Sequence, residues 1–218
     1  MKPTKRTTVA SLILAVLLSA GIPSHAEHAS HETKMMDASS KIAQTDAALR
    51  DLWVGHAFWV RNVAVETIAG NTAAAAVAEN EVVANAKLIA AAIEPFYGKA
   101  ASDKLFELLA GHYGAVKQYL DATVAGSKAK QDAATKNAVS NAVEISKFLS
   151  GANPNLPFDA LNGLLVAHYG HHVQQFQQLK DKQYTEEAQT WEEMKKHMYG
   201  IADALTGALE KQFPSKFR

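Results

Sequence analysis

Four histidines interrupt otherwise apolar helical patterns at related positions of the chain. His56, His112 and His168 each stand within an amphipathic segment, and His197 stands within the last one. Neutral imidazole is the commonest side-chain ligand for transition metals, and three imidazoles with a fourth ligand or a water make a tetrahedral site. If these side chains meet, they predict a metal centre inside a helical protein, where such sites are built from facing helices.

Together with two asparagines, these histidines form three pairs across expected turns. The pairs are His56 with Asn85, His112 with Asn141, and His168 with His197. Each pair is centred on a turn, and equal distance from the turn of an antiparallel hairpin means equal height, about 22 Å away at 1.5 Å per residue. Four histidines and two asparagines are therefore expected at one level, provided that the three hairpins pack side by side in the same sense.

Further polar residues near this level are candidates for additional ligands or for hydrogen bonds that orient the ligands. They are Asn85, Asn141, His171, His172, Tyr113 and Tyr169.

The alternative to a metal centre is a purely structural role for this polar layer. A histidine that faces an asparagine satisfies both groups through a hydrogen bond, and a polar layer can fix the register of a helical bundle.

The elements that position these residues come from an internal repeat. The sequence matches itself at an offset of 56 residues, most clearly where 83–118 aligns with 139–174 without gaps. Twelve of these positions are identical, against roughly two expected by chance from average composition. The same offset continues more faintly toward both ends, which indicates three repeats.

Each repeat is expected to form two helices, because apolar residues recur at three- and four-residue spacing. Glycine and polar residues at 70–71, 126–127 and 181–183 mark turns within repeats, and prolines at 95, 154 and 157 separate the repeats. The expected helices are residues 40–69, 72–94, 101–125, 129–150, 157–181 and 184–211. The fold class is therefore all-α: a bundle of six helices arranged as three tandem 56-residue antiparallel hairpins, at about 38–95, 96–151 and 152–211.

The N-terminal sequence is typical of an exported protein. Three basic residues precede an apolar run at 9–22, and Ser24-His25-Ala26 has the small residues of a cleavage site. We expect a signal peptide at 1–26 with a cut after Ala26, a flexible tether at 27–37, and a single helical domain at 38–218. The mature protein would be periplasmic or secreted.

Composition narrows the class of partner. Lys plus Arg and Asp plus Glu both number 22, without a basic block, which argues against nucleic acid. No segment of the mature chain is apolar enough to span a membrane. The chain has no cysteine, so disulfides and covalent haem attachment are excluded. Haem held without a covalent bond, between His168 and His197, stays open.

Several short motifs resemble an uncharacterised family of bacterial exported helical-bundle proteins. They are Leu52-Trp53-Val54-Gly55-His56, Asn85-Ala86 with Pro95-Phe96-Tyr97-Gly98, Asn141-Ala142 with Phe148-Leu149-Ser150, and Gln212-Phe213-Pro214. Members of that family resemble one another in an acidic residue just before the histidines, where this chain has Gly55, Gly111 and Ala167. The resemblance implies a helical bundle and carries no established activity.

Three functions follow from these observations, and a binding role is favoured over an enzymatic one. The first is an exported protein that binds a transition metal, copper or zinc, through His56, His112, His168 and His197. The second is a structural or interaction protein whose His and Asn layer only sets helix register. The third is a hydrolase with a zinc-bound water on three histidines.

Overall fold

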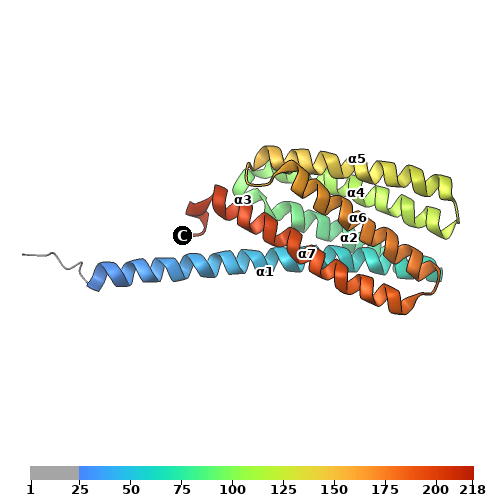
Figure 1. Cartoon of the computed structure of the whole chain (residues 1–218), viewed down its shortest axis with the longest axis horizontal. Helices are drawn as coiled ribbons and strands as arrows, with labels where there is room; N and C mark the ends of the chain where they lie inside the picture. The colour runs from blue at the N-terminus through green and yellow to red at the C-terminus, as the bar shows by residue number, and fades with distance from the viewer. Residues whose placement is uncertain (1–24) are drawn as a thin grey trace, which may run out of the picture.

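The computed structural model describes residues 25–218, and all its long elements are α-helices (Figure 1). The six long helices are α1 His25–Ala69, α2 Thr72–Ala92, α4 Lys99–Val124, α5 Lys128–Ala152, α6 Phe158–Lys180 and α7 Tyr184–Gln212. A four-residue helix, α3 Glu94–Tyr97, and a 3₁₀ turn, η1 Pro214–Lys216, complete the order. Residues 25–218 contain no strand, so the predicted all-α class with six long helices is confirmed.

Three turns of the same construction join the long helices in pairs. The residues after α1, α4 and α6 reverse the chain with a positive φ: Gly70 at 81°, Gly126 at 65° and Lys182 at 59°. In each turn the next backbone N–H donates to the carbonyl five residues earlier, from Asn71 to Glu66, Ser127 to Ala122 and Gln183 to Gln178. This is the Schellman motif, which satisfies carbonyls left free at a helix end. The three turning positions are 56 residues apart, as the sequence repeat requires.

The long helices pack in a closed ring. The pairs α1 with α2, α4 with α5, and α6 with α7 lie against each other, and contacts of α2 with α4, α5 with α6 and α7 with α1 complete the ring (Figure 1). The first helices of the three pairs, α1, α4 and α6, also contact one another. Side chains on their inner faces therefore meet in the interior. None of the helices within residues 25–218 is long and apolar enough to cross a bilayer.

The N-terminal part of the chain differs from expectation. Helix α1 begins at His25 rather than near residue 40, so the stretch expected to be a flexible tether, 27–37, is helical. Figure 1 shows this end of α1 projecting beyond the rest of the bundle. The stretch contains no glycine or proline and several good helix formers, so nothing in it stops the helix. Residues 1–24 of the expected signal peptide lie outside the described range, and its cut after Ala26 stays a prediction.

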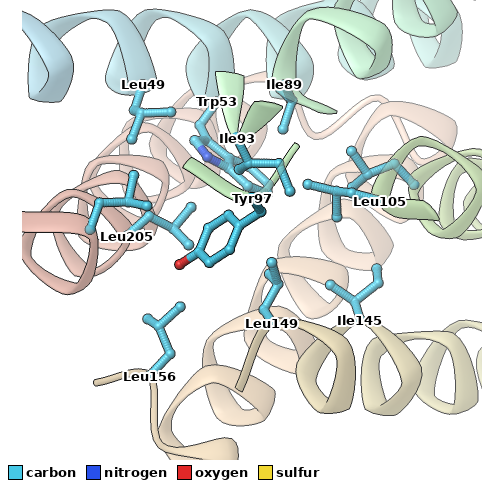
Figure 2. Close-up of a pocket in the computed structure, with 12 residues that line it drawn as sticks. Leu49, Trp53, Ile89, Ile93, Tyr97, Leu105, Ile145, Leu149, Leu156 and Leu205 are labelled. Atoms are coloured by element: carbon cyan, nitrogen blue, oxygen red, sulfur yellow. The ribbon is translucent and has the colours of Figure 1, made fainter. Parts of the chain in front are cut away.

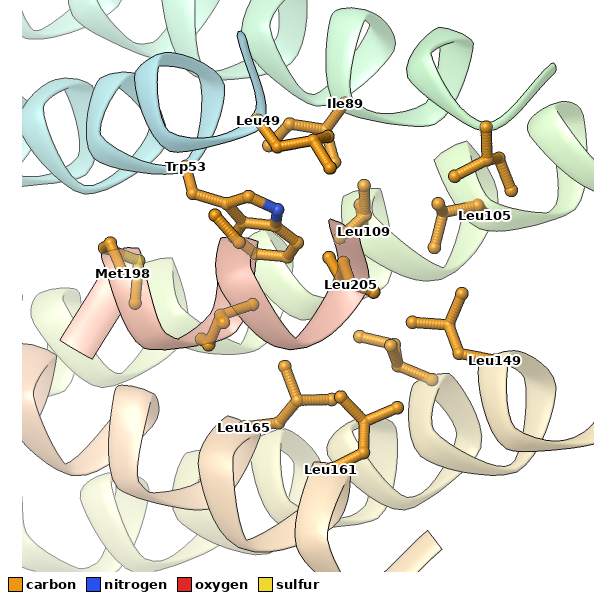
Figure 3. Packing of buried hydrophobic residues seen from close by; sticks show 14 of the residues in the cluster. Leu49, Trp53, Ile89, Leu105, Leu109, Leu149, Leu161, Leu165, Met198 and Leu205 are labelled. Atoms are coloured by element: carbon orange, nitrogen blue, oxygen red, sulfur yellow. The ribbon is translucent and has the colours of Figure 1, made fainter. Parts of the chain in front are cut away.

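The core consists of two apolar clusters. Figure 3 shows the first, in which Leu49, Ile89, Leu109, Leu165 and Met198 belong to five different long helices. The second lies toward the three turns and includes Val60, Val82, Val116 and Phe176. The predicted layer of histidines and asparagines falls near the boundary between the two clusters in sequence on the first five long helices, which contribute to both clusters, whereas α7 contributes to the first cluster only.

The first cluster encloses a small apolar cavity of about 30 Å³ (Figure 2). Leucine and isoleucine side chains form most of its wall, and Trp53 and Tyr97 contribute their rings. A small cavity with such an apolar lining stays dry. The polar layer therefore borders an apolar, water-free region on this side.

Candidate metal centre

Four histidines lie buried where α1, α4 and α6 meet. His56 on α1 is 6% exposed, His112 on α4 is 4% exposed, and His168 and His172 on α6 are 1% and 0% exposed. His168 and His172 are four residues apart, so both project from the same face of α6. We call these four residues the inner histidines.

The inner histidines are arranged around His168. Its ring centroid lies 4.5 Å from that of His172, 5.5 Å from that of His56 and 5.9 Å from that of His112. His56 and His172 are themselves 6.1 Å apart by the same measure. Side chains from three helices thus converge at one point of the core, as the common height in the sequence predicted.

Three of these residues lie close enough together that they could hold a metal ion. His56, His168 and His172 each offer one ring nitrogen, and the three nitrogens lie within 4.8 Å of one another. The Nε2 atoms of His168 and His172 are 3.2 Å apart. Two nitrogens bound to one tetrahedral ion at 2.0–2.1 Å would be about 3.3 Å apart. The spacing of this helical pair therefore matches that of neighbouring ligands.

Most of the remaining ring nitrogens have no hydrogen-bond partner. The Nδ1 atoms of all four inner histidines are buried without a partner, and the Nε2 atom of His112 is in the same state. A buried polar atom without a partner costs about 1–3 kcal/mol by the measure of protein mutations. Several such atoms at one place are unfavourable for stability alone, which points to a ligand that would use them.

Burial keeps the inner histidines neutral. It lowers the pKa of His56 to about 3, with a further contribution from nearby His112, and lowers the pKa of His112 to about 4. The pKa values of His168 and His172 are lowered well below the ordinary value of 6.5, first by burial and then by the other histidines. Neutral imidazoles carry the free lone pair that a metal requires, so the cluster is ready for coordination at neutral pH.

The other residues of the predicted layer make a different set of contacts. Asn85, Asn141 and His197 each reach the backbone of the preceding helix, at the carbonyls of Leu52, Leu108 and Leu164, over 3.0, 3.1 and 2.8 Å. The three bonds are equivalent under the 56-residue repeat. At Asn85 this bond to a carbonyl replaces the expected hydrogen bond to His56, whereas Asn141 lies close enough to His112 to offset part of the lowering of the pKa of His112. His197 lies with its ring centroid 6.5 Å from that of His168 and is half-buried.

Small residues make room for these crossing side chains. A Cβ at Gly55 would stand 3.2 Å from the Nδ2 of Asn85, and a Cβ at Gly111 would stand 3.1 Å from the Nδ2 of Asn141. In the third pair the equivalent residue is Ala167, and the longer side chain of His197 still reaches the Leu164 carbonyl. The residue before each histidine therefore has a structural reason to be small.

The remaining candidates lie around the inner histidines. His171 is half-buried, and its ring centroid lies 5.3 Å from that of His197. The tyrosines do not orient the histidines as expected: the hydroxyl of Tyr169 pairs with that of Thr135 at 3.0 Å, and the buried hydroxyl of Tyr113 has no partner. The Nε2 atom of His197, a common axial ligand of haem, is occupied by the Leu164 carbonyl, so this geometry does not favour haem between His168 and His197.

One buried polar network escaped the sequence reasoning. Arg61 donates two hydrogen bonds of 2.6 Å to the carboxylate of Glu187, which is only 2% exposed, and Gln175 donates a third. The network links α1, α6 and α7 on the side of the turns. Its only trace in the sequence is that Gln175 and Glu187 occupy positions on the inward faces of their helices. It is separate from the histidines, and the Oε1 atom of Gln175 is buried in it without a partner.

No protein-family profile, curated protein or solved structure matches this chain. This agrees with a resemblance to an uncharacterised family, from which no activity can be transferred. The three closely spaced histidines thus have to be interpreted from their own geometry.

Proposed function

We propose that this protein binds one transition-metal ion through His56, His168 and His172, with His112 beside them as a fourth ligand or a neighbour that orients the ion. The observation that supports the proposal best is the convergence of three buried nitrogens within 4.8 Å. The unpartnered nitrogens around this point add weight, because coordination would satisfy atoms that are otherwise costly to bury. The proposal includes the exported location indicated by the N-terminal sequence.

The charge of the surroundings bears on the choice of ion. The groups that shift the pKa values of the inner histidines are other histidines and Asn141, and none is a carboxylate. Burying a charge without a counter-charge is costly, and the Born cost rises with the square of the charge. Imidazole suits both copper and zinc. A neutral, dry site therefore favours monovalent copper, and we place Cu⁺ ahead of Zn²⁺.

A register-setting role remains the second candidate, and the structure supports it for part of the layer. Asn85, Asn141 and His197 fasten each second helix to the backbone of the first through equivalent hydrogen bonds. Such bonds fix the register of helix pairs. The inner histidines make no bond of this kind to a backbone carbonyl: His168 and His172 pair with each other on the same helix, and His112 lies close to Asn141. The layer thus divides into an outer part that sets register and an inner part available to a ligand.

The burial of the site favours binding over hydrolysis. A catalytic zinc keeps an open coordination position that substrate can reach. All four inner histidines are at most 6% exposed, and the apolar cavity of the first cluster has no histidine in its lining. A zinc-dependent hydrolase would need a rearrangement of the helices, so we propose a binding protein.

The decisive experiment titrates chelator-treated protein with Cu⁺ under anaerobic reducing conditions and, separately, with Zn²⁺, each in competition with a chromophoric chelator. We expect about one equivalent of bound ion and a melting temperature that rises with ion concentration. The variant His172→Leu should lose the ion. The control Gln178→Leu changes another buried polar residue of α6 and should keep it.

The stability of the metal-free variants separates the two candidate functions. His172→Leu removes a buried Nδ1 that has no partner, but it also takes away the Nε2 that pairs with His168, so the two effects offset each other. A metal ligand replaced in this way should change the stability of the metal-free protein by no more than about 1 kcal/mol. A residue that only sets register should instead cost stability when replaced. Wild-type protein that binds neither ion, together with a destabilised His172→Leu variant, would overturn the metal-binding proposal.

A further inference from the structure

The buried histidines require a route by which an ion can reach them. The apolar cavity on one side of the layer has a lining of leucine, isoleucine and aromatic side chains, without a ligand for an ion. On the other side, the second apolar cluster and the network of Arg61, Glu187 and Gln175 fill the interior. An ion that crosses either region would lose its hydration without compensation. The route must therefore offer ligands along its way.

A line of histidines leads from the centre to the surface between α6 and α7. The ring centroid of His168 is 6.5 Å from that of His197, which is in turn 5.3 Å from that of His171. Exposure increases along this line, since His168 is 1% exposed whereas His197 and His171 are both half-buried. Neighbouring rings are close enough for an ion to exchange one imidazole for the next.

His197 is oriented as a metal ligand would be. Its Nε2 atom pairs with the Leu164 carbonyl at 2.8 Å, and since a carbonyl can only accept, Nε2 must carry the proton. The Nδ1 atom then holds the free lone pair. Metal-binding histidines commonly use the same device, in which a hydrogen bond from one ring nitrogen fixes the tautomer and aims the other nitrogen.

A carboxylate completes the outer end of this line. Glu193 is exposed and lies one helical turn before His197 on α7. It is also close enough to His171 to raise the pKa of that residue, against a larger lowering by burial and by His197. Two imidazoles and one carboxylate are a ligand set that zinc and copper accept. The three groups do not lie within 4.8 Å of one another, so the exposed side chain of Glu193 has to turn toward the two rings to complete this set. The negative charge at the surface would attract a cation before it enters the neutral interior.

We propose that His171, His197 and Glu193 form a loading site between α6 and α7, which takes a transition-metal ion from solution and passes it through His197 and His168 to the inner histidines. This inference rests on the proposed function. A loading site lowers the barrier of transfer in both directions. Its loss should slow uptake and release by the same factor and leave the affinity of the inner site unchanged.

The test follows the kinetics of uptake in full-length, chelator-treated protein. Protein is mixed with Zn²⁺ held by a chromophoric chelator, and in a parallel anaerobic series with Cu⁺ held by a chelator of its own. The variants are His171→Gln and Glu193→Gln. The control is Gln174→Ala, an exposed residue one turn along α6 from His171.

We expect the double variant to take up and release the ion at least tenfold more slowly than wild type, with an equilibrium affinity within about twofold of wild type. The control should behave as wild type. Unchanged kinetics in the double variant would overturn the loading site while leaving the inner site intact. A variant whose affinity falls as much as its rate of uptake would also overturn it, because these residues would then belong to the final site. Wild type that binds no ion would refute the proposed function itself.

Discussion

At the scale of single residues, the inner histidines make the metal-free protein sensitive to acid. Burial lowers the pKa of His112 from the ordinary 6.5 to about 4 in the folded state. Between these values the unfolded chain binds more protons than the folded chain, so the free energy of unfolding decreases as the pH falls from 6.5 toward 4. Above 6.5 both states are neutral and the effect vanishes. His112 alone would cost roughly 3 kcal/mol over this range, at about 1.4 kcal/mol per pKa unit.

This predicts a different pH profile for a variant without the residue. Metal-free His112→Gln should lose less stability than wild type between pH 7.5 and pH 4.5, as measured by urea denaturation at each pH. The control His171→Gln removes a histidine that is only half-buried, so it should keep most of the wild-type dependence. Equal slopes for His112→Gln and wild type would show that His112 protonates as readily in the folded state as in the unfolded chain.

The residues of the candidate metal centre could be predicted from the sequence only in part. The spacing of 56 residues identified His56, His112 and His168 as residues at one height, and they do converge. His172 was expected to be an additional residue, although it contributes the third nitrogen of the closest group. Its spacing of four from His168 was the available signal, since that spacing places two side chains on one helix face. The sequence could not show that His197 lies apart from the inner histidines. The repeat predicts the height of a residue in the bundle, but it does not predict which backbone carbonyl the side chain reaches.

At the scale of helices, the small residue before each histidine controls how closely the two helices of a pair approach. A methyl group at Gly111 would press on the Nδ2 atom of Asn141, which is held by its hydrogen bond to the Leu108 carbonyl. Gly114, one turn later on α4, has open space around it. Alanine normally stabilises a helix interior by about 0.5–1 kcal/mol relative to glycine.

We therefore expect Gly114→Ala to raise the free energy of unfolding by about that amount. The free energy of unfolding of Gly111→Ala should be at least about 1 kcal/mol lower than that of Gly114→Ala, because the gain in helix propensity is offset by crowding or by the loss of the Asn141 hydrogen bond. Chemical denaturation of the two variants at pH 7.5 provides the comparison. If both were stabilised equally, the close approach at Gly111 would carry no energetic weight.

The turn between α6 and α7 departs from the other two at one residue. Lys182 adopts a φ of 59° where the equivalent residues are Gly70 and Gly126. A left-handed backbone costs a residue with a side chain about 1–2 kcal/mol. Glycine avoids this cost, but part of the gain is offset because glycine makes the unfolded chain more flexible. Lys182→Gly should therefore raise the melting temperature by a few degrees, as measured by circular dichroism. Lys182→Ala keeps the strained backbone and should not; an equal gain from both would point to the lysine side chain rather than to φ.

At the scale of the whole molecule, the sequence predicted the helices better than their assembly. Five of the six long helices begin and end within two residues of expectation, since glycine, proline and polar residues mark their ends locally. The closed ring, with α1, α4 and α6 in mutual contact, depends on packing between repeats. Periodicity within a repeat indicates which face is buried, but it does not indicate which helix covers that face. The sequence could therefore predict that the histidines meet only if the three hairpins pack side by side.

The start of α1 was predicted wrongly for a different reason: the local sequence is compatible with a helix, although this part of the helix projects beyond the bundle. Figure 1 shows the first turns of α1 extending past the bundle, and Met36 is 75% exposed. From Ile42 on, side chains of α1 pack against the first apolar cluster. An isolated helical segment of about a dozen residues is marginally stable in water. These turns should therefore contribute little to the stability of the domain.

A chain that begins at residue 38 should accordingly unfold within a few degrees of one that begins at residue 27, with a smaller helical signal in proportion to its length. Its affinity for a metal ion should be unchanged, since His56 lies more than four turns further along α1. A chain that begins at residue 50 also loses Ile42 and Leu49 from the core and should melt at a much lower temperature. Substantial destabilisation by the shorter deletion would mean that the first turns of α1 pack against the bundle in solution instead of projecting from it.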